Sequence, residues 1–200
     1  MSRKSDYRDG DSFTKRSRKE GYRSRSSYKL KEILEKQIKL SKGHSVLDIG
    51  SYPGGWSQVA MEKVGKEGKV AAIDTRPMNP LENCFFLKKS IEDLEKKDFN
   101  EIKEYLPFDL VLSDMAPNIS GIRHRDDSMM IGLVDSVLFV VDSLLDSNGS
   151  VLIKVFQGES LDYTNQALKT RFKKVKIFKP KASRANSNET YIIGKEIKIK

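Results

Sequence analysis

A glycine-rich turn near residue 50 combines residue types that suit a ligand site. A short apolar run over 45–49 leads into Gly50, and Gly54 and Gly55 follow before a segment with helical character. Glycines let the backbone approach a ligand closely, and the start of the next helix adds unpaired N–H groups. Asp48 precedes the turn, and its carboxylate would repel a simple phosphate. The turn therefore predicts a ligand that is more than a phosphate.

A second acid, Asp74, follows the next apolar run over 69–73, where a carboxylate could hold a ribose diol. The two acids indicate a cofactor with a nucleoside and a positive or zwitterionic part, and S-adenosylmethionine fits this description. A dinucleotide is the alternative, but its fingerprint is G-x-G-x-x-G, whereas the spacing from Gly50 is G-x-x-x-G-G. A turn that binds nothing would leave both acids unexplained.

Two further apolar runs end in charged residues. Asp114 follows 108–113, and Lys154 lies within 150–156. An ionised group in a buried strand is costly unless it has a partner or a task. Asp114 is the natural partner of Lys154. An ion pair that only holds the sheet edge remains an alternative on residue types alone.

The segments that must position these residues alternate between strand and helix patterns. We expect a helix near 28–38 that two serines can cap, then strands near 45–49, 69–73, 84–88, 108–113, 150–156, 174–179 and 189–194, with helices near 55–65, 91–105, 127–146 and 160–171. This alternation predicts an α/β fold with a mostly parallel sheet and ligands at its carboxyl edge. The last two strands have only a turn between them, so they should pair antiparallel. A seven-stranded sheet of this kind is that of the class I, Rossmann-like methyltransferases.

Composition bounds the remaining possibilities. Two hundred residues suit one core, so residues 26–200 are expected to form a single domain. No apolar run is long enough for a membrane span. The single cysteine, Cys84, fits a reducing cytoplasm, and we expect it to be a buried residue of a strand. His44 and His124 lack metal-ligand spacing, so no metal site is predicted.

The net charge of +9 is concentrated at the two ends of the chain. Residues 1–25 hold nine Lys and Arg against four Asp and Glu, and residues 169–200 hold eleven against two. Basic ends around an acidic middle suit a polyanion, with nucleic acid as the leading candidate. A lysine-rich solvated surface is the alternative. Residues 1–25 are also poor in apolar residues and are predicted to be a flexible, basic arm.

Five motifs in order resemble those of the FtsJ-type 2′-O-ribose methyltransferases, especially those that modify large-subunit ribosomal RNA. The resemblance covers residues 21–194. The motifs are Tyr28-Lys29 with Leu30-Lys31-Glu32-Ile33, Pro53-Gly54-Gly55-Trp56-Ser57-Gln58, Ser113-Asp114-Met115-Ala116-Pro117-Asn118, Lys154-Val155-Phe156-Gln157-Gly158, and Ser183-Arg184-Ala185-Asn186-Ser187-Asn188-Glu189.

The resemblance implies a catalytic tetrad of Lys29, Asp114, Lys154 and Glu189. It also implies cofactor contacts, which fall on Gly54, Trp56, Asp74, Asp114 and Ser90. Two positions depart from the family. Ser90 stands where the family commonly has an acid that accepts from the adenine amino group, and Glu92, Asp93, or apolar and backbone contacts could compensate. Tyr52 replaces a small residue and could crowd or stack on the cofactor.

The implied reaction is methyl transfer from S-adenosylmethionine to a ribose 2′-hydroxyl, with a uridine in 23S rRNA as the expected target. No metal is required, because the leaving group is a neutral thioether. Lys154 is the hypothesised proton acceptor, although nearby acids favour its charged form and hence a role in aligning the hydroxyl. A tRNA substrate and an inactive RNA-binding assembly factor are the alternatives. We expect a monomer that acts on the large ribosomal subunit and does not bind membranes.

Overall fold

The computed structural model describes residues 5–184 and 186–198, with side chains from residue 12 onward. Its centre is a seven-stranded sheet in the order β3-β2-β1-β4-β5-β7-β6. The strands are β1 (Ser45–Ile49), β2 (Lys69–Asp74), β3 (Cys84–Lys88), β4 (Phe108–Ser113), β5 (Leu145–Phe156), β6 (Phe172–Phe178) and β7 (Glu189–Ile197). The first five pair in parallel, and β7 pairs antiparallel with both β5 and β6. The predicted mostly parallel sheet with an antiparallel C-terminal strand pair is confirmed.

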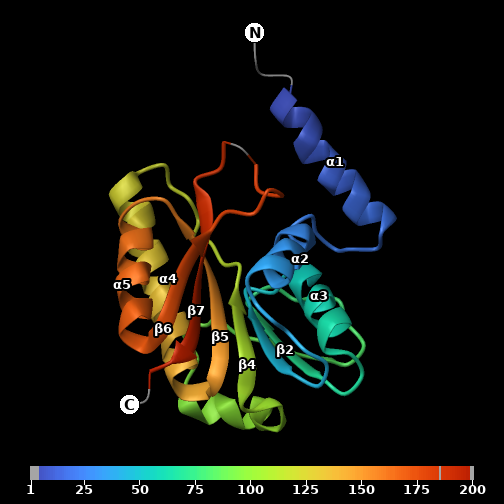
Figure 1. Ribbon diagram of the computed structural model, residues 1–200, viewed down its shortest axis with the longest axis vertical. Coiled ribbons are helices and arrows are strands. Elements are labelled where there is room, and N and C mark those ends of the chain that lie inside the picture. Colours follow the sequence, from blue (N-terminus) through green and yellow to red (C-terminus); the bar gives the residue numbers. More distant parts are fainter. Residues whose placement is uncertain (1–4, 185, 199–200) are drawn as a thin grey trace.

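Helices cover both faces of the sheet (Figure 1). On one face, α2 (Ser27–Lys36) and α3 (Gly55–Val64) pack against the apolar side chains of β1 and β4; on the other lie α4 (Arg123–Leu144), α5 (Glu159–Arg171) and the 3₁₀ helix η1 (Lys96–Tyr105). Alternation along β5 explains this arrangement, since Leu152 joins the α2 side while Val151 and Ile153 join the α4 side. Burial on both faces makes the strands nearly continuous apolar runs.

Three local features differ from the sequence expectations. β5 begins at Leu145 rather than near 150, since Leu145 pairs with Phe108 across an irregularity in the ladder. The helix expected near 91–105 is a 3₁₀ helix that begins only at Lys96. Ser26 occupies the N-cap of α2 but does not cap it with its side chain; its hydroxyl lies 2.6 Å from that of Ser24.

The N-terminal segment contains a helix, α1 (Ser5–Lys19), where an irregular segment was expected. Its C-terminal half packs on α2, with the rings of Phe13 and Tyr28 5.5 Å apart and the Arg16 guanidinium 4.9 Å from the Tyr28 ring. The Tyr28 hydroxyl donates to Glu20 at 2.9 Å. Aromatic and cation–π contacts therefore anchor this end of α1, which the low apolar content of the segment did not suggest. Flexibility of the arm as a whole stays a prediction.

No helix within the described residues is long and apolar enough to span a membrane.

Candidate active site

The four predicted tetrad residues meet at the carboxyl edge of the parallel strands as two ion pairs. Lys29 Nζ lies 2.6 Å from Glu189 Oε1, and Lys154 Nζ lies 3.2 Å from Asp114 Oδ1. Lys154 also donates to the backbone carbonyl of Asp114. The side chains of the four residues are only 10–19% exposed. The structure therefore brings together groups that are up to 160 positions apart in the sequence.

Tyr191 joins the two ion pairs. Its hydroxyl lies 3.1 Å from Asp114 Oδ1 and 3.3 Å from Glu189 Oε1, so it shares one proton between the two carboxylates. Burial, followed by the charges of Asp114 and Glu189, raises the pKa of Tyr191 well above its usual value. The residue therefore stays a donor. Sequence reasoning missed it, although a tyrosine two positions after Glu189 on the same strand must share its face of the sheet.

Glu189 is kept ionised by its neighbours. Burial acts to raise its pKa, but the charge and hydrogen bond of Lys29, the charge of Lys154, and a 3.1 Å hydrogen bond from Ser183 together lower it. A buried carboxylate with several donors is stable as an anion. Ser183 lies in the motif identified from sequence, but its contact with Glu189 was not predicted.

The elements that carry the tetrad are held in register by packing and backbone contacts. The neighbours of Lys29 on α2, Leu30 and Ile33, are completely buried, which fixes the rotation of the helix. Glu32 accepts hydrogen bonds from the backbone N–H groups of Lys181 and Ala182 at 2.8 and 3.4 Å. These bonds tie α2 to the loop before β7, and therefore set Lys29 against Glu189.

The β5–β7 register places Lys154 opposite Tyr191. Both side chains consequently point to the same face, where Asp114 arrives from the end of β4. The pairing of Lys154 with Asp114 that the sequence suggested is present in the structure.

The glycine turn lies beside the tetrad. Gly54 has a φ of 107°, a conformation that favours glycine, and a Cβ there would lie 2.8 Å from Met78 Sδ and 2.9 Å from an Arg23 nitrogen. Trp56, in the first turn of α3, is 2% exposed, with its indole ring 5.8 Å from the Tyr191 ring. Its N–H donates to Ser26 O at 3.0 Å. Trp56 therefore links the turn to the tetrad and uses its one donor within the protein.

Asp74 and Ser90 lie at the ends of the next two strands. Both carboxylate oxygens of Asp74 accept backbone N–H groups, from Tyr52 at 2.9 Å and Arg76 at 2.8 Å. The Ser90 hydroxyl is half-buried and accepts from Glu92 N at 3.3 Å. Tyr52 is 42% exposed beneath the Arg76 guanidinium, which lies 4.1 Å from its ring centre. Tyr52 is thus held at the rim of the turn.

Three buried polar atoms near the turn have no hydrogen-bond partner among the described residues: Asp48 Oδ1, Ser51 Oγ and Ser113 Oγ. They come from the end of β1, the turn itself and the end of β4. Buried polar groups in proteins are usually paired, so unpaired ones indicate a bound ligand or water. Burial, opposed by the 2.6 Å hydrogen bond from Ser57 and assisted by the charges of Asp114 and Asp74, raises the pKa of Asp48 to about 7.

Arg23 is a further residue that sequence reasoning missed. Its guanidinium donates to the carbonyls of Asn79 at 2.7 Å, Pro80 at 2.8 Å and Pro53 at 3.3 Å. It therefore bridges the glycine turn to the loop after β2. Nothing in its local sequence, a basic segment with few apolar residues, distinguishes Arg23 from the other arginines nearby.

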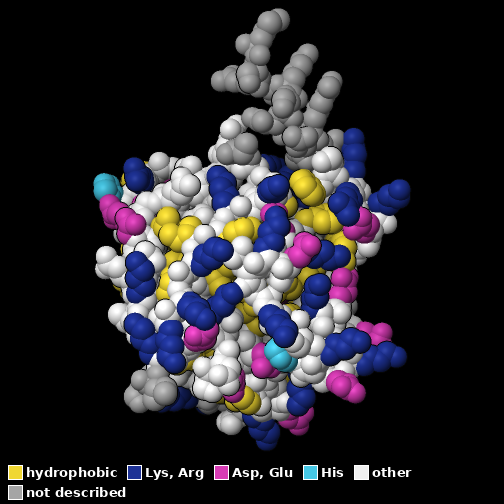
Figure 2. Space-filling model, in the orientation of Figure 1, with side chains coloured by type: hydrophobic (Ala, Val, Ile, Leu, Met, Phe, Trp, Pro, Cys, Tyr) yellow, Lys and Arg dark blue, Asp and Glu magenta, His cyan; other side chains and the backbone are white. Residues whose placement is uncertain are grey.

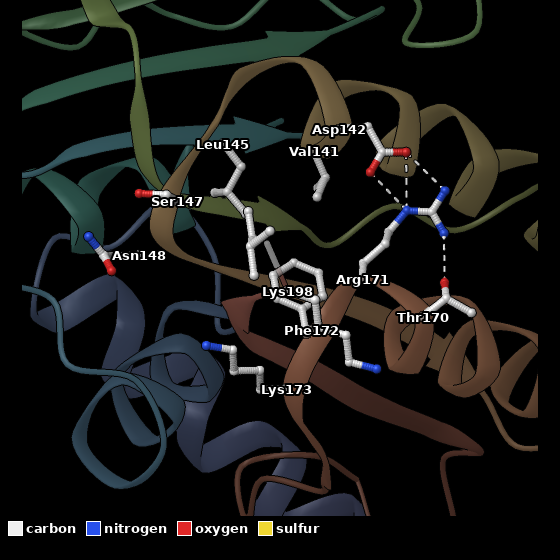
Figure 3. Close-up of a pocket in the computed structure, with 11 residues that line it drawn as sticks. Val141, Asp142, Leu145, Ser147, Asn148, Thr170, Arg171, Phe172, Lys173 and Lys198 are labelled. Carbon is white, nitrogen blue, oxygen red and sulfur yellow. Dashed lines mark hydrogen bonds and ion pairs between the residues drawn. The ribbon is translucent and has the colours of Figure 1, made fainter. Parts of the chain in front are cut away.

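A hollow of about 760 Å³ lies at the opposite end of the sheet, lined by Val141, Asp142, Leu145, Ser147, Asn148, Thr170, Arg171, Phe172, Lys173, Ile197 and Lys198 (Figure 3). Arg171 Nε lies 2.9 Å from Asp142 Oδ1, and both side chains are about one-third exposed. None of the predicted site residues lines this hollow. Among the described residues, no cluster of three or more His, Cys, Asp or Glu could hold a metal.

The fold and this edge define an α/β methyltransferase of the Rossmann-like class. The FtsJ-like methyltransferase family model matches residues 22–197, and the chain belongs to that family. It is 44% identical over 193 residues to ribosomal RNA large subunit methyltransferase E of Methanothermobacter thermautotrophicus, covering 95% of this chain and 91% of that protein. It is 43% identical over 189 residues to the protein of the same name from Stutzerimonas stutzeri, covering 94% and 92%.

A solved structure is also similar. The crystal structure of a protein described as a ribosomal RNA methyltransferase from Plasmodium falciparum matches with a TM-score of 0.79 and 29% sequence identity, over 88% of this chain and 98% of that one. The methyltransferase fold and family predicted from the sequence are therefore confirmed.

Proposed function

We propose that this protein transfers the methyl group of S-adenosylmethionine to the 2′-hydroxyl of a ribose, with a uridine in 23S rRNA of the large ribosomal subunit as its target. The observation that carries the proposal is the convergence of two buried ion pairs, bridged by Tyr191, beside a glycine turn with unpaired polar atoms. The named relatives, both ribosomal RNA large subunit methyltransferases E, support the choice of substrate.

The residues present fit the methyl donor. Asp48 Oδ1, Ser51 Oγ and Ser113 Oγ are buried without partners and suit a ligand with ammonium and hydroxyl groups. The backbone at Gly54 has no side chain to block close approach, and Asp74 and Ser90, near the ends of β2 and β3, are proposed to hold the ribose and the adenine. The bound donor supplies an already activated methyl group on a sulfonium. No metal is needed, since the leaving group is a neutral thioether.

Lys154 is proposed to orient the 2′-hydroxyl and to receive its proton. As an ammonium, Lys154 gives two of its three N–H groups to the carboxylate and the carbonyl of Asp114, and the third is free to align the ribose oxygen. An ammonium cannot accept a proton, so the transfer requires the neutral amine, whose lone pair then takes the place of the third N–H and receives the hydroxyl proton. Two ion pairs around this oxygen favour alignment first and proton loss late in the reaction. Lys29 and Glu189 complete the network, and Tyr191 keeps the two carboxylates at a fixed separation.

A basic surface on β6 and β7, toward the end of these strands away from Glu189, suits RNA. In Figure 2, lysine and arginine side chains gather over the face that β6 and β7 present. Lys174 lies opposite Lys195 in the ladder, and Lys176 is the next residue of β6 on the same face. Partial burial, followed by the charges of Lys176 and Lys174, lowers the pKa of Lys195. Clustered cations of this kind gain affinity by releasing counterions from a phosphate backbone.

The two alternatives are less well supported. An inactive assembly factor predicts a damaged turn or tetrad, and here both are complete in sequence and compact in geometry. A tRNA substrate is compatible with the same tetrad, so it must be separated by experiment. The tetrad comes entirely from one chain, which favours action as a monomer.

The experiment is transfer of labelled methyl groups to isolated large subunits, naked rRNA and tRNA. We expect modification of the ribosomal substrate at one ribose. Activity confined to tRNA would overturn the substrate, and no transfer to any RNA would overturn the activity. A pH–rate profile of Lys154→Arg tests the role of Lys154, because an arginine keeps the charge but is not a base. Near-full activity would exclude Lys154 as the proton acceptor.

A further inference from the structure

Ile119 and Ile122 are the most exposed of the large apolar side chains in the described part of the chain, at 59% and 61%. They lie in the loop between β4 and α4, which begins after Asp114. Scattered exposed apolar residues are normal, but two in one short loop next to a buried charged site are not explained by packing. The loop therefore presents apolar surface to something outside the protein.

The loop is held in shape by Asp126. Its carboxylate accepts hydrogen bonds from Ser120 N at 2.7 Å, Ser120 Oγ at 2.7 Å and Gly121 N at 3.1 Å. These donors, led by the Ser120 backbone N–H, lower the pKa of Asp126. Asp126 N in turn donates to Ile122 O at 2.9 Å. Both isoleucines thus flank a fixed turn, and their exposure follows from its geometry.

The base of the loop is tied to the segment that follows Lys154. Asp127 Oδ1 accepts from Ser160 N at 3.0 Å, and Asp127 is 5% exposed. A Cβ on Gly158 would lie 3.1 Å from Asp127 Oδ2 and 3.4 Å from an Arg123 nitrogen. The loop therefore sits over the ends of β4 and β5, the strands that deliver Asp114 and Lys154, and lies at the same end of the sheet as the β6–β7 loop (Figure 1).

Basic side chains directly follow Ile122 in the chain. Arg123, His124 and Arg125 are all exposed at the start of α4. Arg123 reaches Asp127 only at 4.0 Å, and His124 Nδ1 lies 3.1 Å from Glu159. Apolar side chains flanked by guanidinium groups match a nucleotide, which has flat, apolar base faces and an anionic backbone. Apolar side chains also act as wedges between stacked bases in nucleic-acid complexes.

We propose that Ile119 and Ile122 form an apolar wedge against the base of a nucleotide next to the target ribose, with Arg123 and Arg125 on its phosphates. This inference rests on the proposed function, since it requires an RNA substrate. The wedge separates the target nucleotide from its neighbour, so the 2′-hydroxyl is presented to Lys154 in one orientation. The two isoleucines are positioning residues for the substrate and have no part in methyl-donor binding.

The test compares three variants of the full chain on large subunits from cells lacking the gene. Ile119→Ser/Ile122→Ser is expected to lower kcat/KM for RNA about tenfold or more, whereas Ile119→Leu/Ile122→Leu keeps most of the activity. Phe139→Ser is the control, because it removes a 39% exposed apolar side chain from another part of α4. Calorimetry should find S-adenosylmethionine binding unchanged in all three.

A photo-crosslinking residue at position 119 provides the second measurement. We expect a crosslink to rRNA within a few nucleotides of the methylated ribose. Two results would overturn the wedge but not the proposed function. One is a crosslink from position 119 to a ribosomal protein. The other is full activity of the double serine variant on subunits that the wild-type protein also methylates. Wild-type protein that methylates no RNA would instead overturn the proposed function, so the two failures are distinguishable.

Discussion

Two regions of the molecule place a cation against a carboxylate, at opposite ends of the same sheet. At the carboxyl edge, the members of both tetrad pairs are 10–19% exposed, whereas Arg171 and Asp142, beside the 760 Å³ hollow, are 31% and 34% exposed. Desolvating charges is expensive, and exposed pairs contribute little. The hollow lies at the C-terminal ends of α4 and α5. We propose that the costly burial of charge, rather than the size of a hollow, marks the functional end.

The largest difference between the two regions should appear when one carboxylate is neutralised in each. Asp114→Asn is expected to lower methyl transfer about 1,000-fold, because it removes the negative charge that pairs with Lys154 and accepts from Tyr191. Asp142→Asn, its matched control, should leave the rate within about twofold. Rates on large subunits measure both. Similar losses in the two variants would contradict the assignment of function to the carboxyl edge.

The next effect sharpens the comparison by removing a single hydroxyl at the carboxyl edge and, as a control, one between α4 and α5 outside the site. Tyr191→Phe is expected to lower kcat about 10- to 100-fold with S-adenosylmethionine binding retained, because the two carboxylates lose their bridge. Tyr163→Phe removes a hydroxyl that donates to Asp135 on the helical side and should have no effect on the rate. An unchanged kcat in Tyr191→Phe would show that the bridge is only structural.

A smaller effect concerns stability and pH. The folded protein holds a proton on Asp48 up to about pH 7, whereas the unfolded chain releases it near 4. The folded state therefore binds more protons between these values, and this contribution to stability is lost as the pH rises from 4 to 7.

Asp48→Asn removes that dependence. The difference in unfolding free energy between wild type and variant should change by about 3 kcal/mol between pH 5 and pH 8, with the wild type losing stability relative to the variant at higher pH. Denaturant melts of the donor-free protein at pH 5 and pH 8 measure it. A difference that does not vary with pH would mean that Asp48 is ionised throughout.

The smallest effect is expected at the amino end. Arg171→Ala removes a partly exposed ion pair and should lower the unfolding free energy by about 1 kcal/mol or less, with no change in methyl transfer. Thermal melts and rate measurements on the same preparation check both parts. A loss of methyl transfer without loss of stability would show that the hollow takes part in function.

Much of the fold was predictable because its signals are local. Most strands are apolar runs that end near Asp74, Asp114 or a similarly polar residue, so their approximate positions and the mostly parallel sheet followed from pattern alone, although the start of β5 did not. The pairing of Asp114 with Lys154 also followed, because a lysine within a buried strand needs a counter-charge. In contrast, Lys29 and Glu189 looked ordinary, and only the resemblance to the family connected them.

The parts that could not be predicted depend on three-dimensional contacts. The hydrogen bonds of Tyr191 to the two carboxylates depend on the register in which β5 pairs with β7. The hydrogen bonds from Arg23 that join the glycine turn to the loop after β2 depend on how the segment before α2 packs. Helix α1 was missed because its segment is highly charged, and its anchorage comes from Phe13 and Tyr28 rather than from an apolar stripe.

The sheet order carries a consequence for biosynthesis. The last strand in the chain, β7, is inserted between β5 and β6 and brings Glu189 and Tyr191 with it. Since chains emerge from their N-terminus, β5 and β6 have no common neighbour until β7 is made. A nascent polypeptide of this protein thus has no complete tetrad until β7 has been made, and products that end before Glu189 are expected to be inactive.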